Sequence, residues 1–394
     1  MRGGNIETMV GGTIKVIQML PELNTGGVER GTLELGAFLT VSGHQSIVIS
    51  GGGRMVPQLE SEGSRHLTWP HIGEKSPRCL KYFFPLRRFL LKEGADVLHL
   101  RSRLPAWVAF LAWKSLPVKK RPVLVTTFHG FFSVNSYSAI MTKGEKIIAV
   151  SKTIADHIRE AYDVTAERIV LIPRGVDEKL FNPENVTVER IRNLKERWGL
   201  NGNTDPVVML PGRVTRWKGH DVFLKSLVGI KELPWKAIMV GELDKTSEYT
   251  RILEKMVADL DFGERAKFVG HCSDMPAAMM LAEIVVSASS TEPEAFGRTS
   301  VEAQAMGKPV IVSAHGGSLE TVLDGKTGWH VKPGDSEALS ACLRIALSDE
   351  SVRKKMGEEG RKWVVSQFTI TKMCEKTLAL YQELLLSKNA RSQT

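Results

Sequence analysis

Two glutamates stand eight positions apart late in the chain, in a segment that could recognise hydroxyl groups. Glu294 and Glu302 flank Phe296 and Gly297 in the string Glu-Ala-Phe-Gly-Arg-Thr-Ser-Val-Glu. We expect Glu294 in a loop after a strand over residues 284–289, and Glu302 on the helix that follows, whose N-terminus would point N–H groups at a phosphate. Paired carboxylates can also perform acid/base catalysis, as in glycosidases, and a capped surface helix with scattered acids would look similar. This separation suits recognition of two different hydroxyl groups, one on a sugar and one on a ribose.

Two cations follow a strand that we expect over residues 207–212. Arg213 and Lys218 are five positions apart in the string Gly-Arg-Val-Thr-Arg-Trp-Lys-Gly. Open α/β sheets bind ligands at the carboxyl ends of their strands. A forked guanidinium and a compact ammonium that converge there suit a diphosphate. A solvated basic loop would explain the same two residues equally well if they stood alone.

Adjacent glycines, Gly26 and Gly27, follow the first expected strand and precede a helix expected over residues 30–40. Glycines let backbone N–H groups approach an anion, and the helix N-terminus favours negative charge. We therefore favour a phosphate-facing loop over a simple tight turn. The string is not the Gly-x-Gly-x-x-Gly fingerprint of dinucleotide-binding proteins, which argues against a dehydrogenase.

The elements that must position these residues alternate between short apolar runs and longer helical patterns. Most runs are apolar on both faces, as in parallel strands buried between helices. This alternation predicts an α/β fold with two Rossmann-like domains. We place the N-terminal domain at 13–185 and the C-terminal domain at 186–365, with the division in a polar stretch that contains Pro183, and we expect 366–394 to form a last element built on a long helix over 368–388. Strands are expected at 14–20, 46–50, 97–100, 123–129, 146–151, 168–173, 207–212, 236–241, 266–271, 284–289, 309–313 and 329–332.

The composition of the 394-residue chain, 42% hydrophobic and 25% charged, is typical of a soluble globular protein. No apolar run reaches the roughly 20 residues of a membrane-spanning helix, and residues 1–12 lack the apolar core of a signal peptide. The four cysteines are far apart, so we expect neither a disulfide framework nor a zinc site, and a cytoplasmic location. The net charge of +9 predicts attraction to nucleic acid, anionic lipid or phosphorylated substrates.

Taken in order, three strings resemble the motifs of the family-4 glycosyltransferases of the GT-B fold. They are Gly-Gly-x-Glu near the N-terminus, Gly-Arg-x4-Lys-Gly at the start of the second half, and Glu-x-Phe-Gly-x4-Glu late in the chain. Smaller matches are His129-Gly130, Phe268-Val269-Gly270 and Gly316-Gly317-Ser318-Leu319-Glu320. The resemblance implies two Rossmann-like domains that face a cleft, the first binding the acceptor and the second the nucleotide sugar, with a C-terminal helix that crosses back onto the N-terminal domain.

The resemblance also implies a role for each matched residue. The enzyme would move a sugar from a nucleotide diphosphate sugar with retention of configuration. Arg213 and Lys218 would neutralise the leaving diphosphate, Glu294 would bind sugar hydroxyls, and His129 would lie beside the reacting carbon. The other donor-binding residues would be Gly26 and Gly27 at the diphosphate, Val269 and Gly270 near the base, Glu302 at the ribose, and Ala295, Phe296 and Gly297 through their backbone N–H groups.

No metal and no cofactor is expected, because fixed cations and N–H dipoles can stabilise the leaving diphosphate. The one Asp-x-Asp string, Asp259 to Asp261, falls in a helical pattern and is interpreted as a solvated helix end. Among donors a UDP-sugar is favoured by its frequency in the family, and GDP-mannose and ADP-heptose stay open. A sugar-nucleotide epimerase of the same fold and a non-catalytic nucleotide-sugar binding protein are the alternatives.

Basic and aromatic residues are mixed in the N-terminal half. Cations attract anionic lipid headgroups or phosphorylated glycans, and aromatic rings favour the membrane interface. We therefore expect a glycan or lipid-linked acceptor, such as a lipopolysaccharide core, and a peripheral position on the inner face of the cytoplasmic membrane. An ordinary half-buried basic helix is an equal alternative, no nucleic-acid motif accompanies the charge, and the oligomeric state is not predicted. The candidate acceptor or membrane residues are Arg87, Arg88, Arg101 and Arg103.

Overall fold

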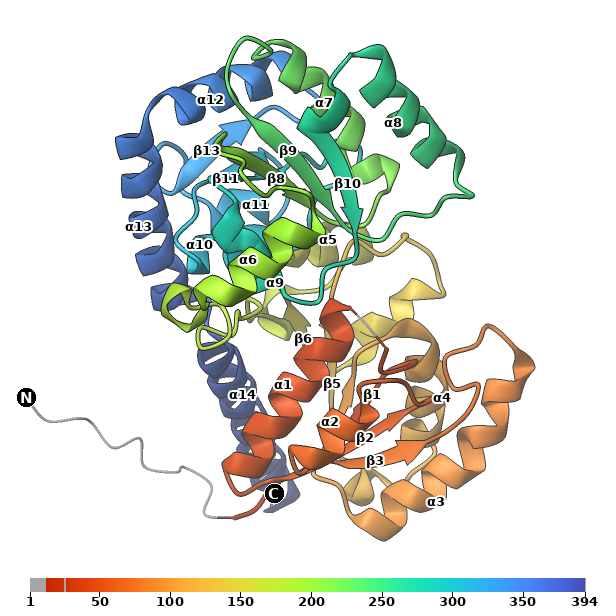
Figure 1. The fold of residues 1–394 in the computed structure, drawn as a ribbon. Coiled ribbons are helices and arrows are strands. Elements are labelled where there is room, and N and C mark those ends of the chain that lie inside the picture. Colours follow the sequence, from red (N-terminus) through yellow and green to blue (C-terminus); the bar gives the residue numbers. More distant parts are fainter. Residues whose placement is uncertain (1–11, 25, 394) are drawn as a thin grey trace, which may run out of the picture. The chain divides into compact units, whose positions relative to one another are not determined.

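The computed structural model describes residues 12–24 and 26–393, which fall into two compact units (Figure 1). The first unit runs to Pro173 and takes up the chain again at Thr371, and the second spans Arg174–Ile370. Each unit is built on its own parallel sheet, so the predicted pair of Rossmann-like domains is confirmed. The division lies earlier than residue 185, because Val176 and Phe181 are buried in the core of the second unit.

The first unit contains a seven-stranded parallel sheet in the order β3-β2-β1-β4-β5-β6-β7. Six strands lie where apolar runs predict them. The prediction lacks β3, an edge strand whose four residues are exposed or half-buried and therefore form no apolar run. The strands are β1 (Lys15–Met19), β2 (Gln45–Ser50), β3 (Arg65–Thr68), β4 (Val97–Leu100), β5 (Val123–Phe128), β6 (Lys146–Ala149) and β7 (Ile169–Leu171).

The helices of the first unit include the last helix of the chain, α14, which runs alongside α1 in Figure 1 and whose Cys374 Sγ lies 3.7 Å from the Glu34 carbonyl oxygen. The α-helices are α1 (Gly27–Val41), α2 (Val56–Ser61), α3 (Phe83–Glu93), α4 (Arg103–Lys114), α5 (Lys152–Tyr162) and α14 (Ile370–Gln393). Short 3-10 helices are η1 (Pro77–Tyr82), η2 (Val118–Lys120), η3 (Ser138–Lys143) and η4 (Ala166–Arg168).

The second unit contains a six-stranded parallel sheet in the order β10-β9-β8-β11-β12-β13, and all six predicted strands are confirmed. Buried apolar side chains cover both of its faces. The strands are β8 (Val207–Pro211), β9 (Lys236–Val240), β10 (Ala266–Gly270), β11 (Ile284–Ser287), β12 (Val310–Ser313) and β13 (Gly328–Val331). The helices are η5 (Pro183–Asn185), α6 (Val188–Arg197), η6 (Arg216–Lys218), α7 (His220–Val228), α8 (Glu248–Asp259), η7 (Gly263–Arg265), α9 (Met275–Leu281), α10 (Arg298–Ala305), α11 (Ser318–Thr321), α12 (Ser336–Ser348) and α13 (Glu350–Gln367).

The final helix begins at Ile370 rather than at residue 368, because Phe368 and Thr369 leave the helical path between α13 and α14. The Val176 N–H donates to the Phe368 carbonyl at 2.8 Å, and the Ile370 N–H donates to the Val176 carbonyl at 3.1 Å. This short pairing interrupts the helix. Farther along α14, the buried Tyr381 hydroxyl lies 2.6 Å from His99 Nδ1 of β4, so the C-terminal helix packs into the first unit.

Candidate functional site

An ion pair stands at the carboxyl edge of the second sheet, where the loops after the neighbouring strands β8 and β11 meet. The Lys218 ammonium contacts Glu294 Oε1, and the Ser289 hydroxyl donates to the same oxygen at 3.1 Å. The two charged side chains are only 17% and 14% exposed. The structure therefore brings together two of the residues that the sequence predicts, and it adds Ser289, which the prediction lacks.

The turn that carries Lys218 is fixed against the end of β11. Gly219 has a φ of +69°, and a Cβ atom there would overlap the Ala288 carbonyl oxygen. The Ser290 N–H also donates to the Trp217 carbonyl at 2.8 Å. Only glycine combines this left-handed backbone with so close an approach. The Lys218 ammonium lies 4.2 Å from the centroid of the Trp217 ring, so its position is determined by rigid neighbours.

The loop after β12 packs directly on the Glu294 segment. The Gly317 N–H donates to the Glu294 carbonyl at 2.7 Å, and a Cβ atom at Gly316, where φ is +61°, would overlap that carbonyl oxygen. After Glu294 and Ala295, Phe296 is buried and Gly297 precedes the first residue of α10. The predicted loop-to-helix junction is thus confirmed.

Glu302 lies on α10, as predicted. Its carboxylate accepts a hydrogen bond from Arg298 Nε at 2.9 Å, one helical turn earlier, and both side chains are largely buried. Glu302 is therefore held in an ion pair within its own helix. Its assignment to a ribose stays a prediction.

Two histidines near this site were not found from the sequence. His315, in the loop after β12, has a lowered pKa because burial outweighs its hydrogen bond to the Ser289 backbone and the nearby Glu294 carboxylate. His220, the first residue of α7, is fully buried, and its ring stacks on Phe268 with 6.4 Å between centroids. Burial, and next the charge of Lys218, lower the pKa of His220 to about 4. Both rings are therefore uncharged at neutral pH. A single His outside a motif carries no sequence signal that would place it beside this site.

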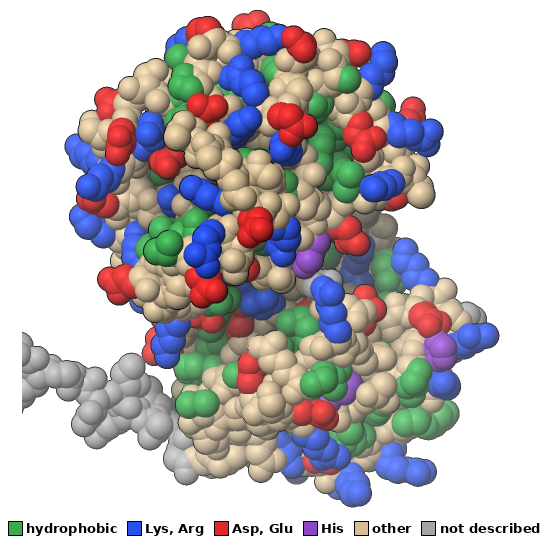
Figure 2. Space-filling model, in the orientation of Figure 1, with side chains coloured by type: hydrophobic (Ala, Val, Ile, Leu, Met, Phe, Trp, Pro, Cys, Tyr) green, Lys and Arg blue, Asp and Glu red, His purple; other side chains and the backbone are tan. Residues whose placement is uncertain are grey.

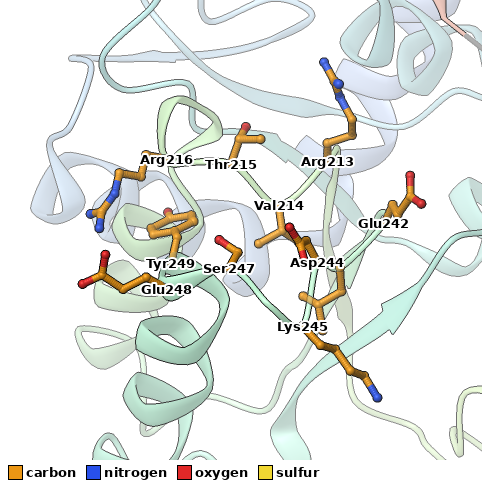
Figure 3. A pocket seen from close by; sticks show the side chains of 11 residues that line it. Arg213, Val214, Thr215, Arg216, Glu242, Asp244, Lys245, Ser247, Glu248 and Tyr249 are labelled. Atoms are coloured by element: carbon orange, nitrogen blue, oxygen red, sulfur yellow. The ribbon is translucent and has the colours of Figure 1, made fainter.

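Arg213 lines an open cavity of about 910 Å³ between the loops after β8 and β9 (Figure 3). Its side chain is exposed and extends away from Arg216 and Lys245 in Figure 3. Within residues 12–24 and 26–393, Arg213 forms no ion pair. The stem of Lys218 passes 3.5 Å from the position of a Cβ atom on Gly212, so the two predicted cations stem from neighbouring parts of one loop, one paired and one exposed.

Tyr249 also lines this cavity and is a further group that the sequence prediction lacks. Its hydroxyl donates to Asp221 Oδ1 at 2.8 Å, and the Arg216 guanidinium lies 5.1 Å from the centroid of its ring. Burial, followed by the hydrogen bond to Asp221, raises the pKa of Tyr249. This contact joins the first turn of α8 to the first turn of α7.

Val269 and Gly270 lie at the end of the edge strand β10, where the register with β9 shifts between Phe268 and Gly270. The Gly270 carbonyl accepts a hydrogen bond from the Gly241 N–H at 2.9 Å. Strand β9 lies between β10 and β8 in the sheet. Gly241 also packs on the Gly212 carbonyl at the start of the loop that carries Lys218. The assignment of Val269 and Gly270 to a base stays a prediction.

Three predicted donor residues belong to the first unit. Gly26 has a φ of +146° and directly precedes α1, and a Cβ atom there would lie 2.5 Å from Glu29 Oε2. Gly27 is the first residue of α1, which begins before the predicted start at residue 30. His129 is half-buried after β5. The two glycines lie after β1 at the start of a helix, and His129 directly follows β5, as predicted. Their roles toward a donor stay predictions.

The candidate acceptor or membrane residues have different surroundings. Arg101 is only 6% exposed, and its Nη1 donates to Gln18 Oε1 at 3.0 Å. Arg101 is therefore part of the interior and does not belong to a basic face, which corrects the prediction. Arg103 donates to the Ser138 hydroxyl at 3.1 Å and lies 4.7 Å from the Phe132 ring centroid. Arg87 is half-buried on α3 and Arg88 is exposed.

The described part of the chain contains neither a cluster of metal ligands nor a helix that could span a membrane. No group of three or more His, Cys, Asp or Glu side chains in residues 12–24 and 26–393 is arranged to hold a metal ion. Asp259 is the last residue of α8, as its pattern predicts. No helix in this part of the chain is both long and apolar enough to cross a membrane.

Comparisons with known proteins match both units. Residues 25–180 match the family described as Glycosyltransferase Family 4, and residues 192–363 match Glycosyl transferases group 1. A solved glycosyltransferase from Rickettsia africae ESF-5 is 34% identical, with a TM-score of 0.87 over 95% of this chain and 99% of that chain. The chain is thus a glycosyltransferase with two Rossmann-like domains. It belongs to the family-4 glycosyltransferases of the GT-B fold, and the resemblance found in the sequence is confirmed.

Other relatives are more distant. A lipopolysaccharide core biosynthesis mannosyltransferase, LpcC, of Rhizobium leguminosarum bv. viciae is 28% identical over 220 residues, which are 55% of this chain and 60% of that protein. The structure of Anabaena Alr3699/HepE in complex with UDP and glucose is 21% identical, with a TM-score of 0.78 over 93% of this chain and 99% of that chain, and shares the fold. The chain spans about half the length of some curated relatives, 53% and 52% in two cases.

Proposed function

We propose that the chain transfers a hexosyl or related group from a nucleotide diphosphate sugar, with a UDP-sugar as the favoured donor, to a glycan or lipid-linked acceptor, with retention of configuration. The observation that carries the proposal is the Lys218–Glu294 pair at the carboxyl edge of the second sheet. A cation suited to a leaving diphosphate and a carboxylate suited to sugar hydroxyls stand there in contact. Both are held by glycine-containing loops that leave them little freedom.

The leaving group sets the electrostatic task of this site. Cleavage of the bond between sugar and diphosphate leaves negative charge on an oxygen, and fixed cations aimed at that charge lower the barrier. As the donor binds, its diphosphate competes with Glu294 for the Lys218 ammonium, and the exposed Arg213 closes on the same group. Glu294, released from Lys218, then accepts hydrogen bonds from sugar hydroxyls. In this proposal no metal and no cofactor is needed.

The proposed route to retention is attack on the face from which the nucleotide departs, with the leaving phosphate taking the acceptor proton. Glu294 is then a recognition group and not a nucleophile. In support, Lys218 and Ser289 both bind its Oε1 atom, which leaves Oε2 for a hydroxyl group. His129 is proposed to bind the donor sugar.

The proposed acceptor is a lipid-linked glycan of the cell envelope, such as a lipopolysaccharide core. Support comes from the similarity to a lipopolysaccharide core mannosyltransferase, and the favoured UDP donor is supported by a structural neighbour that holds UDP and glucose. We place the enzyme in the cytoplasm, at the inner face of the cytoplasmic membrane.

A thermal-shift screen against UDP, GDP, ADP and their sugars tests the donor. A ligand at about 100 times its dissociation constant adds roughly 2.7 kcal/mol of stability, so we expect the melting temperature to rise by several degrees with UDP-sugars. A response to GDP or ADP alone would change the base, and no response to any of them would contradict the proposal. Nucleotide release that requires an acceptor separates a transferase from an epimerase, which acts without one, and from a binding protein, which does not turn over.

A further inference from the structure

A groove of about 430 Å³ lies on the first unit, between the end of β3 and α3, and has no part in the site described above. We call it the α3 groove. Its floor is aromatic and its rim carries two cations. The residues that line it are Trp69, Phe84, Pro85, Arg88, Phe89 and Lys92.

The aromatic floor is already assembled. The Tyr82 ring stacks on Trp69 with 4.9 Å between centroids and 12° between planes, and the Phe89 ring meets Trp69 edge-on at 6.3 Å. The Tyr82 hydroxyl donates to the Pro70 carbonyl at 2.6 Å, which fixes the stack. Phe84 stands at the margin of the groove with 75% of its side chain exposed. A partner that covers this exposed apolar surface gains binding free energy, because the surface is removed from water.

The charge around the groove is strongly positive. Residues 65–93 contain seven Lys or Arg and two Glu, which is +5 of the net +9 of the chain. Glu93 pairs with Arg65 at 3.0 Å and Lys15 at 3.4 Å, and Glu74 contacts His71. In the part of the chain that the structure describes, Arg88 and Lys92 have no carboxylate partner. Figure 2 shows Lys, Arg and hydrophobic side chains close together along this margin of the first unit.

We propose that the α3 groove binds an anionic phospholipid and docks the first unit on a bilayer surface. Arg88 and Lys92, one turn apart on α3, bind the phosphate, while Phe84 and the aromatic floor contact the upper acyl chain. Helices that lie in the membrane interface have the same arrangement: their cations bind the lipid headgroups and their aromatic rings lie at the boundary of the acyl chains. The lining offers no carboxylate, amide or hydroxyl side chain to bind sugar hydroxyls, so a lipid fits better than a soluble glycan.

Three other basic or aromatic residues of this unit, Arg101, Arg103 and Trp107, are buried or engaged by neighbouring side chains and carbonyls. Arg101 is buried and Arg103 is engaged by Ser138 and Phe132. The indole N–H of Trp107 donates to the Tyr137 carbonyl. The biological use of the docking rests on the proposed lipid-linked acceptor, but lipid binding can be measured without catalysis.

The test is co-sedimentation of the full chain with vesicles of phosphatidylglycerol and phosphatidylcholine, and with pure phosphatidylcholine vesicles. The groove variant is Phe84→Ser/Arg88→Gln/Lys92→Gln. The matched control is Val118→Ser/Lys119→Gln/Lys120→Gln in η2, which removes an apolar side chain of similar exposure, 72%, and two exposed lysines. We expect binding to the anionic vesicles at low salt. The partition coefficient should fall roughly thirty-fold in the groove variant, since each cation near an anionic surface contributes about a factor of five, and less than about threefold in the control.

Several outcomes would overturn the inference: no binding of the unaltered chain to anionic vesicles, an equal loss in both variants, or displacement by inorganic phosphate at constant ionic strength, which would indicate a simple phosphate site. Stronger retention on a soluble anionic polysaccharide than on vesicles would reject the lipid in favour of a glycan. The UDP-induced thermal shift, measured on every variant, keeps the two proposals apart. An unchanged shift with lost vesicle binding supports the groove, and vesicle binding without any nucleotide response supports the groove while contradicting the proposed donor.

Discussion

Two arginines after central strands of the two sheets have opposite surroundings. Arg101 directly follows β4 in the first unit, is buried, and donates to Gln18. Arg213 follows β8 in the second unit, is exposed, and lines an open cavity. Burial lowers the pKa of Arg101, whereas Arg213 keeps access to solvent. The same residue type at the same kind of place therefore serves architecture in one unit and is free for a ligand in the other.

The reason for the difference lies in the helices nearby. Gly31 of α1 leaves room for the Arg101 guanidinium, since a Cβ atom there would lie 3.0 Å from Nη2. Tyr381 and Cys374 of α14 are among its close electrostatic neighbours. In the second unit the loop after β8 faces the open cavity instead (Figure 3). The Arg213 side chain is therefore available to a ligand, and the Arg101 side chain is not.

The largest expected effect is on catalysis in the second unit. Lys218→Ala should lower kcat/KM by about 10²–10³-fold, because one preorganised group that stabilises the leaving charge is lost. Initial rates of nucleotide release measure this. Lys225→Ala is the control, since that exposed lysine of α7 makes only a surface pair with Asp221 and should keep its activity. Full activity in Lys218→Ala would show that our role for it is wrong.

Arg101→Met should act on stability. Loss of the guanidinium leaves the buried Gln18 oxygen without its donor, and we expect the free energy of unfolding to fall by about 1–3 kcal/mol in urea titrations. The double variant Gln18→Leu/Arg101→Met should recover part of this loss, because both polar partners are then replaced. A Met variant as stable as the parent would contradict the architectural role of Arg101.

Acid should weaken the second unit through His220. Its pKa is about 4 when folded and near 6.5 when unfolded, so the unfolded state binds the proton more readily. The stabilisation is fully present above pH 6.5 and is lost as the pH falls toward 4. Linkage predicts a loss of roughly 2 kcal/mol between pH 7 and 5. In His220→Phe the difference in unfolding free energy between these two pH values should shrink by that amount, and an unchanged difference would contradict a buried neutral ring.

The smallest expected effect, that of Arg213→Met, tests the contrast between Arg213 and Arg101 most directly. Arg213→Met should lower kcat/KM about tenfold, mainly through a higher KM for the donor, because it removes one contact to the diphosphate. Its unfolding free energy should stay within about 0.5 kcal/mol of the parent, as for exposed positions in general. If Arg213→Met were destabilised as much as Arg101→Met, the distinction between the two arginines would be lost.

Much of the fold could be predicted because buried parallel strands appear in the sequence as apolar runs. This holds for twelve of the thirteen strands, and β3 escaped because Arg65–Thr68 is a half-exposed edge. The break between α13 and α14 could not be predicted for another reason. Phe368 and Thr369 leave the helix to pair with Val176, a partner nearly 200 positions away, and no local pattern carries that information.

Only part of the candidate site could be predicted from the sequence. The ordered motifs indicated Lys218 and Glu294, since spacing relative to strand ends survives without knowledge of packing. Their direct pairing, the hydroxyl of Ser289, and His315 depend on which loops meet at the sheet edge. The burial of Arg101 depends on the last helix of the chain. Distant contacts, and not residue types, decide these features.

The Lys218–Glu294 pair has a consequence for turnover in the proposed reaction. Lys218 and Glu294 are each other's counter-ions, so a free phosphate must displace the Glu294 carboxylate before it binds Lys218. A complete donor replaces the lost ion pair for both residues, because it brings anionic oxygens for the lysine and hydroxyl groups for the glutamate. The spent nucleotide compensates only one of them. Re-formation of the ion pair then competes with the departing product, which favours its exit and limits inhibition by accumulated nucleotide.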